Sequence, residues 1–372
     1  MTKPIALLDL GAQLSRYRDR ALAAMTRVVD ASEFIMGPEV ARFEAALAGY
    51  VDVPYAVSMS SGTDALLAAL MALDVGKDDE VVTTTFSFFA TAGVIARLGA
   101  KPVFVDIDPG TFNATGAALQ AALTPRTRAL LPVHLFGQMT DLGDLWSSSP
   151  VPIIEDAAQS LGARLHGKPT GHFGSMAAVS FFPSKNLGGF GDGGAILTRD
   201  ERLAERLSIL RVHGSKPKYH HHIVGGNFRL DTIQAAVLEI KLEFLEEWST
   251  GRARNAALYD QLFAESGLID RGLVKTPTKS PGSNHVYNQY VLRVENRDDL
   301  QKFMSSRGVG TAVYYPIPLH LQQCFSYLGY NDGDFPNAEA ACKEVLAIPV
   351  YPELESDSIR RVVDEISAFY RL

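Results

Sequence analysis

Short apolar runs alternate with longer amphipathic stretches along residues 1–200. The apolar runs predict β-strands at 55–59, 80–84, 101–106, 127–134, 151–154 and 176–182. The amphipathic stretches predict helices over much of 1–50, one of them opened by Pro38, and at 65–73, 88–98, 117–123 and 142–146. This alternation is typical of an α/β fold in which a mostly parallel sheet lies between layers of helices.

The pattern changes after residue 198. Helices are predicted at 200–213, 230–248, 250–266 and 357–370, a loop at 214–226, and an alternating strand at 286–294. At 372 residues the chain is long enough for a large domain and a smaller one. We place the boundary near residue 245, which gives a large domain (1–245, with a helical N-terminal lead) and a small C-terminal α/β domain (246–372).

Composition and net charge argue against some classes of binding partner, namely nucleic acids and membranes. The net charge of −7 argues against nucleic-acid binding, because a basic surface is missing. The two cysteines are too few for a disulfide framework, so we expect a reducing, cytoplasmic location. The N-terminus lacks the apolar core of a signal peptide, and no apolar run reaches the roughly 18 residues of a membrane span. We therefore expect no membrane partner.

Residues 151–195 hold the main candidates for chemistry. The run 151–154 ends in the polar sequence Glu155-Asp156-Ala-Ala-Gln159, and the run 176–182 is followed by Pro-Ser-Lys185 and a glycine-rich loop. In open α/β sheets, ligands bind at the carboxyl ends of the strands. We therefore expect Asp156, Gln159 and Lys185 to meet at one crevice.

A lysine directly after a buried strand is costly to bury without a partner. Burial lowers the pKa of such an amine and makes it nucleophilic, as Schiff-base chemistry requires. Enzymes that use pyridoxal phosphate pair this lysine with a carboxylate at the cofactor's pyridine nitrogen. Lys185 and Asp156 fit these two roles, although a surface lysine in a turn and a plain helix N-cap are the simpler readings.

Other motifs point to weaker hypotheses. Ser60-Ser-Gly-Thr-Asp64 opens a predicted helix, where free backbone N–H groups can bind an anion or merely be capped. The loop 188–194 has neither a dinucleotide fingerprint nor a Walker sequence. The adjacent histidines 220–222 lack the spacing of a metal site, and we expect no metal. Ser184 lacks the Gly-x-Ser-x-Gly context of a hydrolase.

Several runs occur in an order that resembles a known family: Ser61-Gly-Thr-Asp-Ala-Leu66, Glu155-Asp-Ala-Ala-Gln159, Ser180-Phe-Phe-Pro-Ser-Lys185 and Gly226-Asn-Phe-Arg-Leu230. Together they resemble the DegT/DnrJ/EryC1/StrS family of nucleotide-sugar aminotransferases, over nearly the whole chain. The resemblance implies the aminotransferase fold type I, the cofactor pyridoxal 5'-phosphate and a homodimer with shared active sites.

The resemblance also implies roles for individual residues. Lys185 would be the catalytic lysine that binds the cofactor. The other cofactor contacts would be Asp156 at the pyridine nitrogen, Gln159 at the ring hydroxyl, Phe88 stacked on the ring, Gly62, Thr63 and Ser180 at the phosphate, and Asn227 at the phosphate of the other subunit. Candidates for the substrate are Arg229, Tyr315 and His320.

The implied reaction moves an amino group from L-glutamate to a nucleotide-linked keto sugar. Gly191-Asp-Gly-Gly194 resembles the members that aminate carbon 3, so a dTDP-3-keto-6-deoxyhexose or a UDP-3-keto-N-acetylglucosamine type of sugar is favoured. The product would serve a polysaccharide, lipid A or a glycosylated natural product. The alternatives are a carbon-4 aminotransferase, a pyridoxal-dependent sugar dehydratase or eliminase, and a non-catalytic regulator that binds the cofactor. Lys185 stands where the dehydratases have histidine, which favours transamination.

Overall fold

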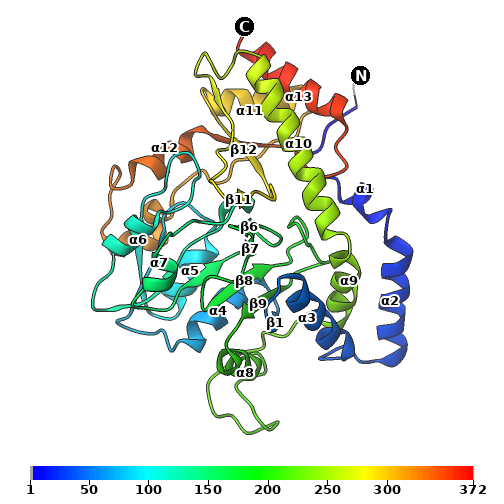
Figure 1. Cartoon of the computed structure of the whole chain (residues 1–372), viewed down its shortest axis with the longest axis vertical. Helices are drawn as coiled ribbons and strands as arrows, with labels where there is room; N and C mark the ends of the chain where they lie inside the picture. Colours follow the sequence, from blue (N-terminus) through cyan, green and yellow to red (C-terminus); the bar gives the residue numbers. More distant parts are fainter. Residues whose placement is uncertain (1–2, 372) are drawn as a thin grey trace.

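The computed structural model describes residues 3–371, and its centre is a mixed sheet (Figure 1). Four strands lie in the order β1 (Tyr55–Met59), β9 (Gly194–Thr198), β8 (Met176–Ser180) and β5 (Ile154–Asp156). A second, parallel group has the order β3 (Lys101–Val105), β2 (Glu80–Thr84) and β4 (Thr127–Leu131). Parallel bridges from Leu130 to Ile153 and from Val133 to Asp156 join the two groups side by side. Within the first group, only β9 runs against its neighbours.

Both faces of this sheet are buried, as a mostly parallel sheet requires. Alternate residues of β8 enter different cores: Met176 and Ala178 pack on one face, and Ala177 and Val179 on the other. The first face is covered by α4 (Gly62–Ala72), α5 (Ala90–Arg97) and α8 (Glu201–Leu210). The second is covered by α3 (Pro38–Tyr50) and α9 (Thr232–Leu242), with α2 (Arg18–Ala31) packed outside α9.

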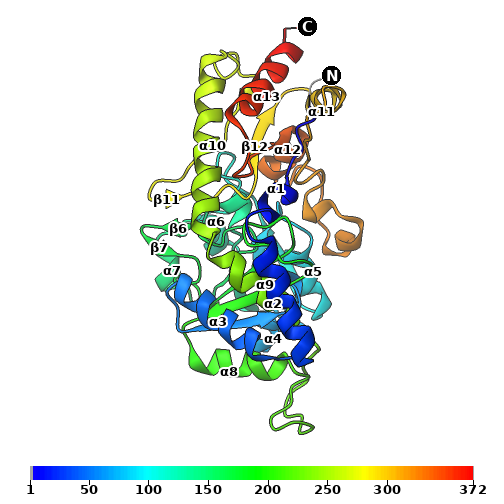
Figure 2. The ribbon, with the colours of Figure 1, turned by 90° about the vertical axis from the view of Figure 1, so that its right-hand side faces the viewer.

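Shorter elements complete this part of the molecule. They are α1 (Leu10–Leu14), α6 (Gly116–Ala121), η1 (Leu135–Gly137), α7 (Leu145–Ser148) and a small antiparallel sheet of β6 (Arg164–Leu165), β7 (Lys168–Pro169) and β11 (Ser283–Asn284). Between α8 and α9, the loop around the three histidines projects away from the body of the protein (Figures 1 and 2).

A second hydrophobic cluster lies at the end of the molecule that holds both termini (Figure 1). Its antiparallel sheet has the order β10 (Val274–Lys275), β12 (Tyr290–Val294) and β13 (Val345–Ile348). It packs against α10 (Leu245–Glu265), α11 (Arg297–Ser306) and α13 (Ser356–Phe369), and Ile5 of the N-terminal segment belongs to the same cluster. The connection from α11 to β13 contains η2 (Leu319–Leu321), η3 (Gln323–Leu328) and α12 (Pro336–Glu344).

Several sequence predictions about element limits were wrong, and two of them are instructive: those for β5 and for the break between α9 and α10. The strand predicted at 151–154 overlaps β5 only at Ile154. The observed strand continues through Glu155 and Asp156, because both carboxylates find buried partners. The helix predicted at 230–248 is divided at 243–244, and α10 continues through Gly251. A Cβ at Gly251 would lie 2.9 Å from Cβ of Pro352, so this glycine allows close packing and does not end a helix.

Among residues 3–371, no helix combines the length and the apolar character that crossing a lipid bilayer requires.

Candidate active site

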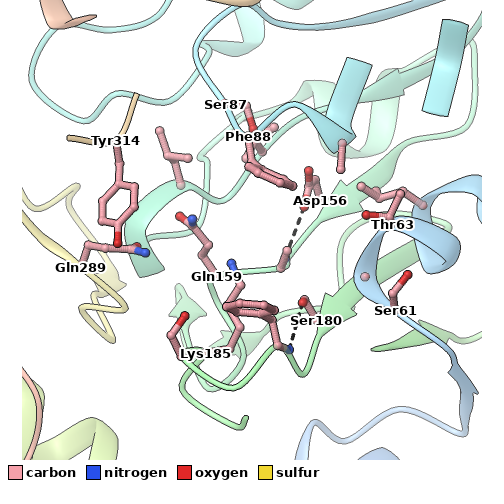
Figure 3. A pocket seen from close by; sticks show the side chains of 18 of the residues that line it. Ser61, Thr63, Ser87, Phe88, Asp156, Gln159, Ser180, Lys185, Gln289 and Tyr314 are labelled. Carbon is pink, nitrogen blue, oxygen red and sulfur yellow. Dashed lines mark hydrogen bonds between the residues drawn. The ribbon is translucent and has the colours of Figure 1, made fainter. Parts of the chain in front are cut away.

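A pocket of about 600 Å³ opens at the carboxyl ends of β5 and β8 (Figure 3). Asp156 is the last residue of β5, and Gln159 lies in the turn that follows it. Lys185 comes from the turn after β8, and its side chain points into the pocket together with that of Gln159. The structure thus brings these three residues to one site, as strands that end at the same edge of a sheet predict.

Asp156 is 5% exposed and is held by hydrogen bonds from two directions. The hydroxyl of Thr91 donates to Oδ2 at 2.7 Å, and the backbone N–H of Ala158 donates to Oδ1 at 3.3 Å. Thr91 is itself within 2.8 Å of the Ser87 hydroxyl. Burial raises the pKa of Asp156, while Thr91, Ala158 and then the charge of Lys185 oppose that rise.

The amine of Lys185 titrates near neutrality. Removal from solvent lowers its pKa to about 8, against the opposing influence of the Asp156 charge. At pH 7 to 8 a useful fraction of this amine is therefore neutral and can act as a nucleophile or a base. The lowered pKa of Lys185 depends on its burial in the wall of the pocket, which it shares with the carboxylate of Asp156.

The opposite end of the pocket is built from the start of α4. Ser61 caps this helix by accepting a hydrogen bond from Asp64 N–H at 3.0 Å. Gly62 and Thr63 line the pocket, and as the first residues of the helix they have N–H groups without a partner inside it. A Cβ on Gly62 would lie 2.6 Å from Cβ of Ser180, so only glycine allows the helix to approach β8 so closely. The result is a compact cradle of N–H and hydroxyl groups that suits a phosphate.

Aromatic and amide groups form the remaining wall. Gln159 Oε1 accepts a hydrogen bond from Phe136 N–H at 2.7 Å, and its Nε2 donates to the hydroxyl of Tyr315 at 3.2 Å. The ring centroids of Phe88 and Tyr315 are 6.2 Å apart, and Phe88 is 57% exposed in the open pocket. Its free ring face is available to a planar ligand.

The other predicted residues do not line this pocket. Asn227 and Arg229 line a separate cavity of about 220 Å³, which shares only Asp192 with the active-site pocket. His320 is buried, with Nδ1 2.7 Å from the Thr85 hydroxyl and Nε2 3.1 Å from Glu339 Oε1. In this chain His320 connects η2 to Thr85, the residue after β2, and to Glu339 of α12.

The sequence analysis gave no role to Ser87, Gln289 and Tyr314, which line the pocket. It also gave none to Thr91, which does not line the pocket but contacts Ser87 and donates to Asp156. Thr91 follows Phe88 by one helical turn, but its bond to Asp156 joins residues far apart in sequence. The motif residue Glu155 points to the other face of β5. It accepts from His134 Nε2 at 2.9 Å and from backbone N–H groups of the loop 171–174, and these bonds lower its pKa despite complete burial.

Comparison with known proteins agrees with this geometry. Residues 16–367 match the DegT/DnrJ/EryC1/StrS aminotransferase family, and the chain belongs to that family. It is therefore a sugar aminotransferase that depends on pyridoxal phosphate, and the predicted family and cofactor are confirmed.

Three relatives place the chain within the family. It is 47% identical to a "Pleiotropic regulatory protein" of Geobacillus stearothermophilus, covering 99% of both chains. It is 43% identical to the UDP-2-acetamido-2-deoxy-3-oxo-D-glucuronate aminotransferase of Pseudomonas aeruginosa, covering 96% of this chain and 98% of that one. The crystal structure of S. venezuelae DesV in complex with a ketimine intermediate superposes with a TM-score of 0.95 at 39% identity over 100% of both chains. The predicted aminotransferase fold is confirmed.

The residues of the pocket fit the cofactor of this family. The cradle at Gly62, which a Cβ would fill, suits its phosphate, and the buried carboxylate of Asp156 suits a protonated ring nitrogen. Within residues 3–371, no group of three or more His, Cys, Asp or Glu side chains is placed to hold a metal ion.

Proposed function

We propose that this enzyme moves an amino group from L-glutamate to carbon 3 of a nucleotide-linked keto sugar. The single observation that carries the proposal is the pair of Lys185 and Asp156, an amine with a pKa of about 8 beside one buried carboxylate at the floor of an open pocket. The choice of carbon 3 is supported by relatives 36–43% identical, which are named for UDP- or dTDP-linked sugars with a 3-oxo, 3-dehydro or 3-amino group.

Pyridoxal phosphate supplies an electron sink that makes the α-proton of an amino acid acidic enough to move. In this proposal the neutral amine of Lys185 would take the α-proton as a base, and the protonated amine would then give it back as an acid. The hydrogen bonds from Thr91 and Ala158 lower the pKa of Asp156 against the effect of burial, and its carboxylate would be the partner of the protonated ring nitrogen. Gln159 is fixed by Phe136 and Tyr315, so its amide can orient the ring hydroxyl without reorganising.

The second substrate enters from the open side of the pocket. Phe88 and Tyr315 offer aromatic faces to the cofactor ring and the sugar, while the nucleotide extends outward. We further propose that the enzyme is a homodimer. Asn227 and Arg229 lie outside the pocket of their own chain, which supports their use by the active site of a second copy.

The test is an absorbance spectrum of the purified protein with pyridoxal phosphate, before and after L-glutamate is added. We expect a yellow band that glutamate bleaches and that Lys185→Ala abolishes. A yellow band that glutamate leaves unchanged would contradict the proposed donor.

The position of amination is tested separately. The glutamate-treated enzyme is mixed with a UDP-3-keto or a UDP-4-keto sugar, and the product is analysed by NMR. Return of the yellow band with the 3-keto sugar alone supports carbon 3, whereas return with the 4-keto sugar alone overturns it.

A further inference from the structure

A second, much smaller cavity lies behind one wall of the active-site pocket. Its volume is about 50 Å³, and it shares Ser184, Gln289 and Tyr314 with the larger pocket. Gln289 and Tyr314 stand across the pocket from Ser61 and Thr63, at the end away from the phosphate cradle (Figure 3). The small cavity therefore adjoins the site on the side where no cofactor phosphate is expected.

Arg252 of α10 forms part of the wall of this cavity. It is 4% exposed, and its Nη1 donates to the backbone carbonyls of Tyr287 at 3.1 Å and Asn288 at 3.4 Å. Among residues 3–371, no carboxylate forms an ion pair with it. Burial lowers the pKa of Arg252 to about 10, still well above neutral pH, so a cation sits in a buried site without a direct counter-ion.

Asn288 lines the same cavity, and the hydrogen bonds of its side-chain amide are not satisfied within residues 3–371. It is 6% exposed, and neither Oδ1 nor Nδ2 has a hydrogen-bond partner within the described part of the chain. Oε1 of the adjacent Gln289 is likewise unpartnered. Buried amides are nearly always satisfied in folded proteins, so such a cluster indicates a ligand that supplies the missing partners.

Glu353 is the acidic residue whose charge acts on Arg252, but it forms no ion pair with the guanidinium. Glu353 attracts the guanidinium, but both its carboxylate oxygens lack hydrogen-bond partners within residues 3–371 and it lines neither cavity. Burial raises the pKa of Glu353, which favours its neutral form and weakens it as a counter-ion.

We propose that this cavity is the subsite for a carboxylate of the amino donor, bound by the Arg252 guanidinium and the Asn288 amide; the inference rests on the function proposed above. A space of this size admits a carboxylate but not a sugar ring. Ser184 precedes Lys185, and Asn186 Nδ2 donates to the carbonyl of Val286 at 3.1 Å, so the lysine turn is tied to the segment that carries Asn288. A donor held here by its carboxylate presents its amine toward the lysine.

The sharpest variant is Asn288→Asp, which keeps the size of the side chain and places a negative charge beside Arg252. The new carboxylate occupies the role of the donor's carboxylate and repels it. Because it gives Arg252 a counter-ion, the variant is expected to fold. We expect the glutamate concentration for half-maximal bleaching to rise about 10- to 100-fold, as loss of a charged hydrogen bond implies. The cofactor band and the half-reaction with keto sugar should stay unchanged.

A matched control is Ser249→Ala. Ser249 of α10 resembles Asn288 in being buried and in having no hydrogen-bond partner for its side chain within residues 3–371. It lines neither cavity, so its loss should leave the glutamate titration unchanged. A rise in this control equal to that of Asn288→Asp would show a general disturbance of α10 and overturn the inference.

A second readout does not depend on turnover. Glutarate carries both carboxylates of the donor and has no amine, so its binding to the pyridoxal phosphate enzyme can be followed by calorimetry. We expect binding to the wild type and at least tenfold weaker binding to Asn288→Asp. Equal binding to both proteins, or equal bleaching by glutamate, would overturn the subsite. Glutarate binding that is lost in the variant, in an enzyme that glutamate does not bleach, would support the subsite and contradict the donor.

Discussion

Two lysines of this chain have nearly the same acidity in very different surroundings. Burial lowers the pKa of both Lys185 and Lys241 to about 8. Lys185 faces a pocket and a carboxylate, whereas Lys241 of α9 is 2% exposed and lies 5.4 Å from the ring centroid of Tyr17, 5.9 Å from that of Phe190 and 5.8 Å from that of Trp248.

The comparison shows that a low pKa alone does not make a lysine a catalytic group. The aromatic rings around Lys241 stabilise its cation by cation–π attraction, and at 2% exposure this amine is shielded from a substrate in solvent. Lys185 shares its wall with Asp156, Gln159 and a cradle for phosphate. A low lysine pKa therefore marks a reactive site only where the amine meets a cavity and complementary groups.

The strongest test of this contrast replaces each lysine. Lys185→Ala should lower transamination about 1,000-fold or more, because it removes the group that moves the proton. Lys241→Met should stay within about fivefold of the wild type, since surface and core changes away from the chemistry act mainly on stability. Steady-state rates with L-glutamate and a keto sugar measure both. A large loss in Lys241→Met with an intact fold would break the comparison.

The second test removes the carboxylate that sets the two lysines apart. Asp156→Asn should lower the rate about 100-fold or more, because the ring nitrogen loses its anionic partner. Asp156 raises the pKa of Lys185 against the effect of burial, so the pKa of that amine should fall further. The pH dependence of amine labelling in the cofactor-free protein measures the shift, and an increase would contradict the assigned interaction.

The third test concerns the stability contributed by Lys241. Its pKa is lower in the folded protein than in the unfolded chain, so the wild type should gain stability as the pH rises from about 8 toward 10. Lys241→Met should abolish that part of the gain and raise the free energy of unfolding at pH 7 by about 1–3 kcal/mol. Urea unfolding of both proteins at several pH values gives the difference. A destabilised variant would show that the cation–π contacts outweigh desolvation.

The smallest expected effect comes from Thr91→Val. The Thr91 hydroxyl lowers the pKa of Asp156, so its loss should raise that pKa further. Ionised Asp156 is lost as the pH falls through its pKa, and activity should therefore decline at a higher pH than in the wild type, by about one unit or less. Full pH–rate profiles measure the displacement. An acid limb that moves to lower pH would contradict the role of this bond.

Much of the fold could be predicted because its strands are short and apolar. The ranges 55–59 and 80–84 coincide with β1 and β2. The prediction of strand limits failed where tertiary contacts stabilised polar residues that the local sequence pattern places outside a strand. Glu155 and Asp156 look like the end of a strand, yet His134 and Thr91 satisfy them inside it. The predicted domain boundary near 245 coincides with the first residue of α10, and the division itself stays a prediction.

The site was predictable where residues lie near the carboxyl end of a strand. Asp156 ends β5, Gln159 lies in the turn after it and Lys185 lies in the turn after β8; their roles stay predictions supported by geometry. Asn288 and Arg252 could not be predicted, because they stand out only in the folded protein: within residues 3–371 the buried Asn288 amide has no hydrogen-bond partner, and the buried Arg252 guanidinium bonds only backbone carbonyls and no carboxylate. His320 looked like a substrate contact, but its environment depends on Glu339, which a single sequence does not place beside it.

The helix α10 has a consequence for how the protein can be cut. Its first residue, Leu245, packs with the large sheet, while Ala256, Tyr259 and Phe263 belong to the cluster near the termini. The chain therefore passes from one hydrophobic cluster to the other without an extended connector on which a protease could act. Limited digestion should first cleave the projecting loop around residues 214–226, and an intact fragment that begins within α10 should not accumulate.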